Sequence, residues 1–168
     1  MDNIEFMCGD LIDVAKTVKA DYVVHGCNCF NTMGAGVAKV IADRYPNVYE
    51  ADRKSKYGDI NKLGTVTYAQ TIDGFYIFNA YTQHGVGRGE NVVYVNWKSL
   101  YNSLKCAECV YVRNLKTFNP RDEITIVMPY IGCGLAGGNN IDFINTVEDY
   151  VQLYKHKVKV IIVKYLEK

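Results

Sequence analysis

Two glycine-bearing segments contain the residue types best suited to hold a phosphate-containing ligand. The first covers residues 25–38 and the second covers residues 128–138. Each follows a short β-branched run and precedes a helical pattern. A turn between a strand and a helix N-terminus gathers free backbone N–H groups around phosphate. The pair therefore predicts a ligand with two phosphates, or one long ligand held along a cleft.

The two segments differ in how strongly they indicate a site. A lone Gly34-x-Gly36 is weak evidence, but Asn28 and Asn31 strengthen it because neutral amides suit sugar hydroxyls. The second segment has four glycines within seven residues, at 132–138. Glycines cost backbone entropy, so a fold keeps them where side chains would obstruct something.

Asp10 and His25 each allow a structural and a functional interpretation. Asp10 follows the first predicted strand, where a carboxylate caps a helix or accepts a hydrogen bond from an exocyclic amine such as that of adenine. Taken alone, the residue favours capping. His25 ends a strand beside Asn28, so a structural role and a site role are equally favoured.

A metal site is the competing interpretation of Cys27, Cys29, Cys133 and His25. Cys-x-Cys is a poor zinc spacing, and no second pair accompanies the Cys106-x-x-Cys109 run. We therefore expect no metal and no cofactor.

Composition limits the partners and the compartment. The chain has a net charge of +1 and is 49% hydrophobic, and it shows neither a dense basic cluster nor an apolar run of membrane-spanning length. We expect no nucleic-acid partner and no membrane. The segment Met1–Glu5 lacks a signal-peptide pattern, and the six cysteines do not have framework spacing. Reduced thiols and a cytoplasmic location are the expectation.

Strand and helix patterns alternate, which predicts an α/β fold in a single domain over residues 1–168. The expected strands are 4–8, 22–26, 65–69, 75–78, 124–128 and 158–163, and the expected helices are 10–18, 36–44, 46–57, 96–117 and 141–154.

In combination, these motifs resemble the macro domain, the ADP-ribose-binding fold. The resemblance covers essentially the whole chain and implies a three-layer α/β/α sandwich with a mixed central β-sheet. The forms Met-Gly-Ala-Gly and Ile-Gly-Cys-Gly-Leu are similar to the branch that holds ADP-ribose 1''-phosphate phosphatases and ADP-ribosyl-glutamate hydrolases. The matching pieces are Gly9-Asp10-Leu11, Val23 to Asn28, Met33-Gly34-Ala35-Gly36-Val37-Ala38, Asn79 to Gln83 and Pro129 to Gly138.

The resemblance implies a role for each matching piece. Asp10 would accept from the adenine N6 amine, with Gly9 and the Leu11 N–H beside it. Asn28 would bind the distal ribose, next to Gly26 and Cys27. The distal ribose and its phosphate would lie near the backbone N–H groups of Met33, Gly34, Ala35, Gly36, Val37 and Ala38. The diphosphate would be wrapped by Ile131, Gly132, Cys133, Gly134, Leu135, Ala136 and Gly137.

The chain departs from the hydrolase groups of that family. Thr82 and Gln83 stand where the glutamate-hydrolase group has a lysine, and Ala136 stands where it has an acid. Ala38 stands where the protein-deacylating group has an aspartate. The leading expectation is hydrolysis of ADP-ribose 1''-phosphate, with Asn28 and His25 placing the attacking water. The alternatives are a reader of ADP-ribose without turnover, or a hydrolase acting on ADP-ribosylated macromolecules.

Overall fold

Strands and helices alternate along the chain, as the sequence predicts. A computed structural model describes residues 3–87, 92–116, 122–154 and 158–166. The strands are β1 (Ile4–Cys8), β2 (Tyr22–Asn28), β3 (Val66–Gln70), β4 (Tyr76–Gln83), β5 (Ile124–Pro129) and β6 (Val158–Lys164). The α-helices are α1 (Leu11–Thr17), α2 (Gly36–Arg44), α3 (Pro46–Arg53), α4 (Trp97–Val110) and α5 (Asn140–Gln152).

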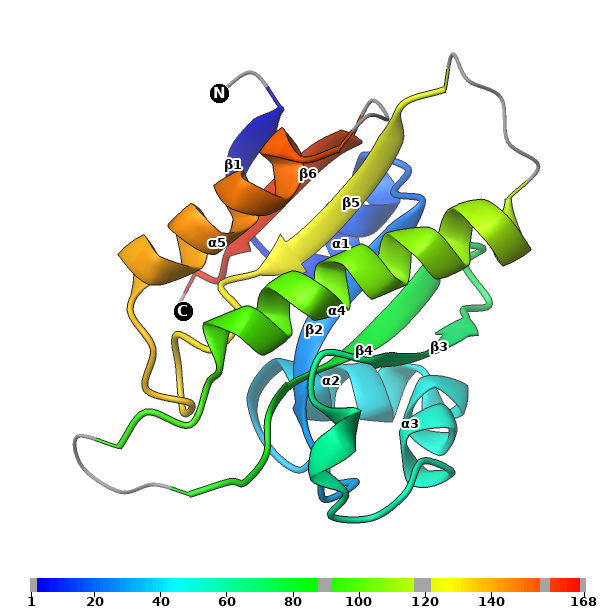
Figure 1. The fold of residues 1–168 in the computed structure, drawn as a ribbon. Helices are drawn as coiled ribbons and strands as arrows, with labels where there is room; N and C mark the ends of the chain where they lie inside the picture. The colour runs from blue at the N-terminus through cyan, green and yellow to red at the C-terminus, as the bar shows by residue number, and fades with distance from the viewer. Residues whose placement is uncertain (1–2, 88–91, 117–121, 155–157, 167–168) are drawn as a thin grey trace.

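The strands form one mixed sheet between two helix layers, which confirms the expected three-layer α/β/α architecture (Figure 1). The strand order is β1-β6-β5-β2-β4-β3. β3 is antiparallel to β4, and the other neighbours are parallel. Helices α4 and α5 cover one face, and α1, α2 and α3 pack against the other. Among the described residues, no helix has the length and apolar character needed to cross a membrane.

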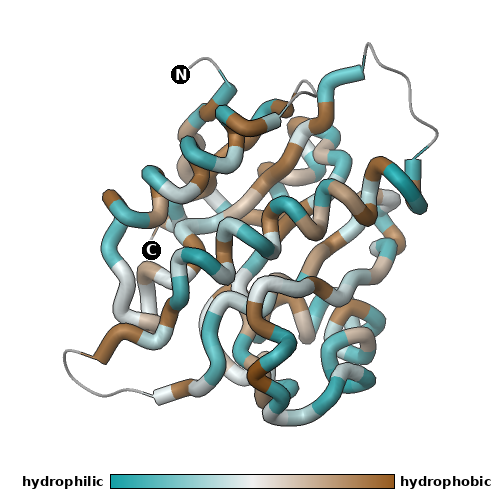
Figure 2. The backbone as a smooth tube through the Cα atoms, viewed as in Figure 1, coloured by the Kyte–Doolittle hydropathy of each residue, from teal (hydrophilic) through white to brown (hydrophobic). Residues whose placement is uncertain are grey.

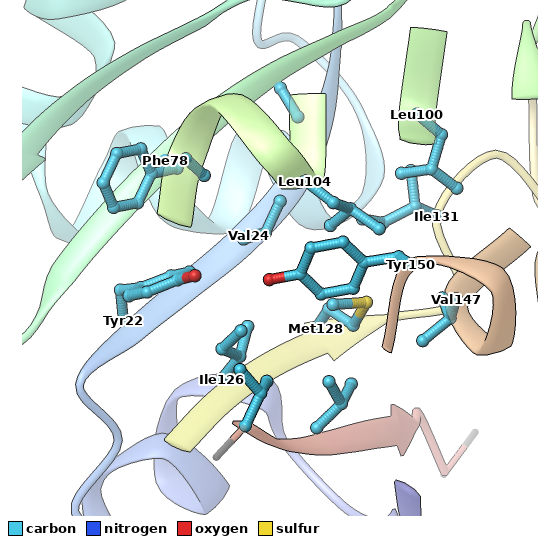
Figure 3. Close-up of a cluster of buried hydrophobic side chains, with 14 of the residues drawn as sticks. Tyr22, Val24, Phe78, Leu100, Leu104, Ile126, Met128, Ile131, Val147 and Tyr150 are labelled. Carbon is cyan, nitrogen blue, oxygen red and sulfur yellow. The ribbon is translucent and has the colours of Figure 1, made fainter. Parts of the chain in front are cut away.

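Each face of the sheet has its own hydrophobic core because successive side chains of a strand point to opposite faces. In β2, Tyr22 and Val24 pack under α4 and α5, whereas Val23 packs toward α1. Figure 2 shows the resulting hydrophobic colour along β5, with polar and apolar residues alternating along α4. In the first core, the hydroxyls of Tyr22 and Tyr150 point toward one another across the layer (Figure 3).

β2 and β4 are longer than the sequence predicts. We expected β2 to end at Gly26 and β4 to end at Phe78, but they continue to Asn28 and Gln83. The two strands pair in parallel along this extension, so polar residues that resemble a loop in sequence are buried in the ladder. The register shifts by one residue near their ends, where Asn28 pairs with Gln83.

Two helix ends also differ from expectation. α3 ends at Arg53 rather than continuing to Tyr57, because side chains take its last carbonyls: Asn31 Nδ2 donates to Arg53 O, and Ser55 Oγ donates to Asp52 O. A 3-10 turn (Ile60–Lys62) follows after Asp59, which caps it. α4 is followed by a π-helical turn at Tyr111–Leu115, and the predicted end at Thr117 lies outside the described residues.

The sheet brings distant loops to one edge. Because five strands are mutually parallel, the segments after β1, β6, β5, β2 and β4 all begin at the same side of the sheet. In open α/β sheets, ligands bind outside these carboxyl ends.

Candidate functional site

A cleft of about 590 Å³ lies at the carboxyl ends of β2, β4 and β5. Its volume falls within the range of about 300–1,000 Å³ that is typical of small-molecule sites. The residues that line it are His25, Gly26, Cys27, Asn28, Thr32, Gly34, Ala35, Gly36, Val37, Ala38, Gln83, Val86, Gly87, Pro129, Tyr130, Ile131, Gly132, Gly134, Leu135 and Ala136.

The N-terminus of α2 forms one wall of the cleft. Ala35 precedes the helix in an extended conformation and caps it with no side-chain hydrogen bond. Gly36 has a φ of 59°, a conformation that favours glycine, and a Cβ at Gly34 or Gly36 would meet open space. The first N–H groups of a helix have no partner within it. This wall therefore offers backbone donors and the positive end of a helix dipole.

The glycines of the opposite wall serve two different purposes. Three of these glycines lie against the segment 92–97. A Cβ at Gly132 would collide with Val95, one at Gly137 with the Val92 carbonyl oxygen, and one at Gly138 with the Trp97 ring. Gly132 and Gly137 also have φ values of 78° and 75°. A Cβ at Gly134 would meet open space, and its φ is not positive. Three of the four glycines thus allow close packing behind the loop, whereas Gly134 faces the cleft.

Asn28 is buried at the base of the cleft, and its amide braces the turn that follows it. Nδ2 donates to Thr32 O at 3.1 Å and to Thr32 Oγ1 at 2.9 Å, while Oδ1 accepts from Phe30 N at 2.7 Å. Both amide protons are therefore in use. The remaining capacity of Asn28 is a lone pair on Oδ1, which suits a hydroxyl donor.

His25 is 1% exposed, and its Nε2 lies 2.6 Å from Asn79 Oδ1. Asn79 Nδ2 donates to Val48 O and Thr67 Oγ1, so its oxygen must accept from His25. Burial lowers the pKa of His25 to about 4, against the raising effect of this hydrogen bond. The neutral ring keeps its proton on Nε2, which leaves only Nδ1 for any base role. The catalytic role of His25 stays a prediction.

The predicted adenine-binding residues lie at the other end of the same edge. Gly9, Asp10 and Leu11 do not line the cleft, because β6 separates β1 from β5. Four strand spacings from β1 to β4 amount to about 19 Å. That span suits one long ligand. Asp10 Oδ1 caps α1 by accepting from Ile12 N and Asp13 N, both at 2.9 Å, as the capping interpretation predicts.

Three other predicted residues lie off the cleft. Met33 is buried in the core beneath α1 and α2. Cys133 and Gly137 belong to the second loop but do not line the cleft. Six other lining residues had no predicted role, although several of them lie within the motifs described above. Strand order explains two of them, since Gln83 ends the neighbour of β2 and Pro129 ends β5. The six residues are Thr32, Gln83, Val86, Gly87, Pro129 and Tyr130.

The cleft lining contains no Asp, Glu, Lys or Arg among the described residues. No group of three His, Cys, Asp or Glu side chains in the described part of the chain has a geometry that could hold a metal ion. Burial raises the pKa of the Cys27 thiol well above its usual value and that of Cys133 to about 11. These thiols are therefore protonated at neutral pH and are weak nucleophiles.

Comparison with known proteins defines the family and the fold. No protein-family model matches the chain. An uncharacterised 17.5 kDa protein from the tk-vs intergenic region of Enterobacteria phage T4 is 32% identical over 165 residues, which cover 95% of both chains. This chain therefore belongs to the same family as that phage protein.

Solved macrodomains share the fold at low sequence identity. The macrodomain of Mycobacterium tuberculosis DarG is 20% identical with a TM-score of 0.71, and the match covers 98% of each chain. Thermosipho africanus DarTG, solved in complex with ADP-ribose, is 15% identical with a TM-score of 0.63 over 94% of this chain and 41% of that one. The fold is that of the macrodomains.

Proposed function

We propose that this protein binds ADP-ribose along the carboxyl edge of its sheet and hydrolyses ADP-ribose 1''-phosphate to ADP-ribose and phosphate. The observation that carries the proposal is the composition of the cleft. The N-terminus of α2 at Gly34–Ala38 and the loop Ile131–Ala136 enclose a cavity whose described lining has no ionic side chain. Ile131 N and Cys133 N already donate within the second loop, so the first turn of α2 is the main source of free backbone donors. An anion in such a cavity is held by backbone dipoles, without a metal. The ADP-ribose in the T. africanus structure supports the choice of nucleotide.

The lining favours a phosphatase over a hydrolase that cleaves the glycosidic bond. Glycoside hydrolysis commonly uses carboxylates beside the scissile bond. The positions that would supply ionic groups hold Ala38, Gln83 and Ala136. In our proposal the distal phosphate lies against the N-terminus of α2, and the free lone pair of Asn28 Oδ1 orients the attacking water. Water attacks phosphorus, the P–O bond to the sugar breaks, and the sugar oxygen takes the proton.

The alternative is a reader that binds ADP-ribose without turnover. The engagement of both Asn28 amide protons with Thr32 favours this alternative, because it leaves the base of the cleft with few free polar groups. Macromolecules that carry ADP-ribose are partners in this case.

The deciding experiment is incubation of the purified protein with ADP-ribose 1''-phosphate, followed by measurement of released phosphate with and without excess chelator. Phosphate release that resists the chelator and falls in Asn28→Ala supports the phosphatase. Calorimetric binding of ADP-ribose with no release supports the reader. No binding of either ligand overturns both.

A further inference from the structure

In the turn that joins β2 to α2, some polar side chains face the cleft and another faces the end of α3. Asn28 and Thr32 bond one another and line the cleft. Asn31 has a φ of 55° and points away from the cleft. Its Nδ2 donates to Arg53 O at 3.3 Å and to Ser55 O at 2.8 Å. Asn31 thus ties the turn to the end of α3 rather than offering its amide to a sugar, as its sequence position suggested.

Lys62 holds the same turn at two points. Its Nζ lies 2.6 Å from Asn31 Oδ1 and 3.2 Å from Cys29 O. Cys29 and Asn31 flank Phe30, whose backbone N–H is the donor to Asn28 Oδ1. One ammonium group therefore fixes both sides of the residue that orients Asn28.

This lysine is buried where an apolar side chain would be less costly. Lys62 is 7% exposed, and its Nζ lies 4.5 Å from the centre of the Tyr81 ring. Tyr81 donates to Asp52 Oδ1 at 2.7 Å, and Asp52 is completely buried. Buried ionic groups are often neutral or unfavourable for stability compared with apolar residues of similar size. What a lysine adds here is therefore geometric: it fixes the shape of the turn.

We propose that Lys62 is a positioning residue, which holds the turn 28–33 in the shape that receives the distal ribose. Lys62 acts through Cys29, Asn31 and Phe30 on Asn28, and it does not touch the ligand. The proposal rests on the proposed function, because the distal ribose is part of ADP-ribose. The two ends of the ligand should therefore respond differently to the loss of Lys62. The contacts to the distal ribose depend on Lys62, whereas those to the adenine and the diphosphate do not.

The test compares ADP-ribose with ADP, which lacks the distal ribose. Lys62→Met keeps an unbranched side chain as far as the ε position and removes the ammonium. Asn31→Gly keeps the positive φ and removes the amide, so it tests the same linkage if Lys62→Met folds poorly. Lys56→Met is the matched control, because Lys56 lies in the same segment with its side chain 81% exposed and ion-paired with Asp59.

We expect Lys62→Met and Asn31→Gly to weaken ADP-ribose binding by about fivefold to tenfold, since each removes hydrogen bonds to a charged group, and to change ADP binding by less than about twofold. Lys56→Met should bind both ligands as the wild type does. Equal weakening of both ligands, or no change in either, overturns the proposal.

Amide hydrogen exchange keeps this proposal separable from the proposed function. In the protein without ligand, the Phe30 amide should exchange faster in Lys62→Met than in Lys56→Met, with protection of the β2 and β4 amides unchanged. If the wild type binds neither nucleotide, the proposed function fails. Hydrogen exchange then still tests Lys62 on its own: equal Phe30 exchange rates in Lys62→Met and Lys56→Met would overturn its positioning role.

Discussion

His25 and Asn79 form a buried hydrogen bond across β2 and β4, with His25 Nε2 donating to Asn79 Oδ1 at 2.6 Å. Asn79 reaches on to Val48 O and Thr67 Oγ1, so this pair links the strand beneath the cleft to α3 and β3. Either protonation state of the ring can donate this hydrogen bond, so burial, rather than the bond, keeps the imidazole neutral. Burial lowers the pKa of His25 from 6.5 to about 4, which makes the pair a determinant of stability against acid.

We predict that His25 makes the protein less stable as the pH falls from 6.5 to 4. The unfolded chain binds the proton near pH 6.5 and the folded chain only near pH 4. Between these values the unfolded state holds more protons, so the free energy of unfolding rises with pH. The contribution amounts to about 2 to 3 kcal/mol between pH 4.5 and 7.5. Urea unfolding of the wild type and of His25→Gln should show a smaller pH dependence in the variant. Equal pH dependence contradicts the assignment.

We predict that substitution of one glycine of the second loop weakens ligand binding, whereas substitution of another lowers stability. Gly134→Val should leave the thermal midpoint within about 2 °C of the wild type, because its Cβ meets open space at a φ that is not positive. It should weaken ADP-ribose binding by more than about tenfold, because the added side chain enters the cleft. Gly137→Ala should cost about 1–3 kcal/mol of stability through its positive φ and its collision with the Val92 carbonyl.

Thermal unfolding without ligand, paired with calorimetry well below the midpoint, separates these effects. Normal binding by a folded Gly134→Val protein means that the loop is only a tight turn. In that case the nucleotide interpretation loses its strongest support.

The sequence predicts the regular elements well because their apolar periodicity is strong. β1 (Ile4–Cys8) and α2 (Gly36–Arg44) have the expected bounds, and the remaining strands and helices differ mainly at their ends. The extension of β4 to Gln83 was not predictable from local pattern. Asn79 and Thr82 are buried there only because β2 pairs alongside, and strand pairing is a long-range property.

The site was predictable to the extent that single loops define it. Residues 34–38 line the cleft, because a strand, a glycine turn and a helix are adjacent in sequence. Their contact with a ligand stays a prediction. Asn31 and Asn28 have the same residue type within one turn, yet one faces α3 and the other the cleft. Only the positive φ of Asn31 and the position of Lys62 distinguish them, and neither can be read from spacing.

We predict that hydrolysis of ADP-ribose 1''-phosphate in ¹⁸O-labelled water places the label in inorganic phosphate. Cleavage of the C–O bond requires stabilisation of an oxocarbenium-like sugar, commonly by a carboxylate, and the described lining has none. In the proposed reaction, the N–H groups of α2 assist attack on phosphorus instead. Mass spectrometry of the phosphate gives the result, with phosphate alone and enzyme as the exchange control. Phosphate without the label contradicts the prediction, whereas label at the C1'' hydroxyl is not diagnostic, because this hemiacetal oxygen exchanges with water.

We predict that Asp10 selects adenine with the oxygen that capping leaves free. Oδ1 accepts from both Ile12 N and Asp13 N, so Oδ2 is the atom available to a base amine. Asp10→Ala would not distinguish adenine binding from helix capping, because loss of the cap alone costs about 0.5–2 kcal/mol of stability. Asp10→Asn separates them, since asparagine caps as well as aspartate but places an amide nitrogen where Oδ2 was.

The Asp10→Asn protein should keep the wild-type thermal midpoint and bind ADP-ribose about tenfold more weakly, the loss expected for one charge-assisted hydrogen bond. It should bind inosine diphosphate ribose more tightly than the wild type does, because the new amide donates to the O6 carbonyl that replaces the N6 amine. Calorimetry with both nucleotides measures this exchange of preference. A general loss of affinity for both bases would mean that Asp10 only caps α1, and unchanged affinity for both would place adenine elsewhere on the edge of the sheet.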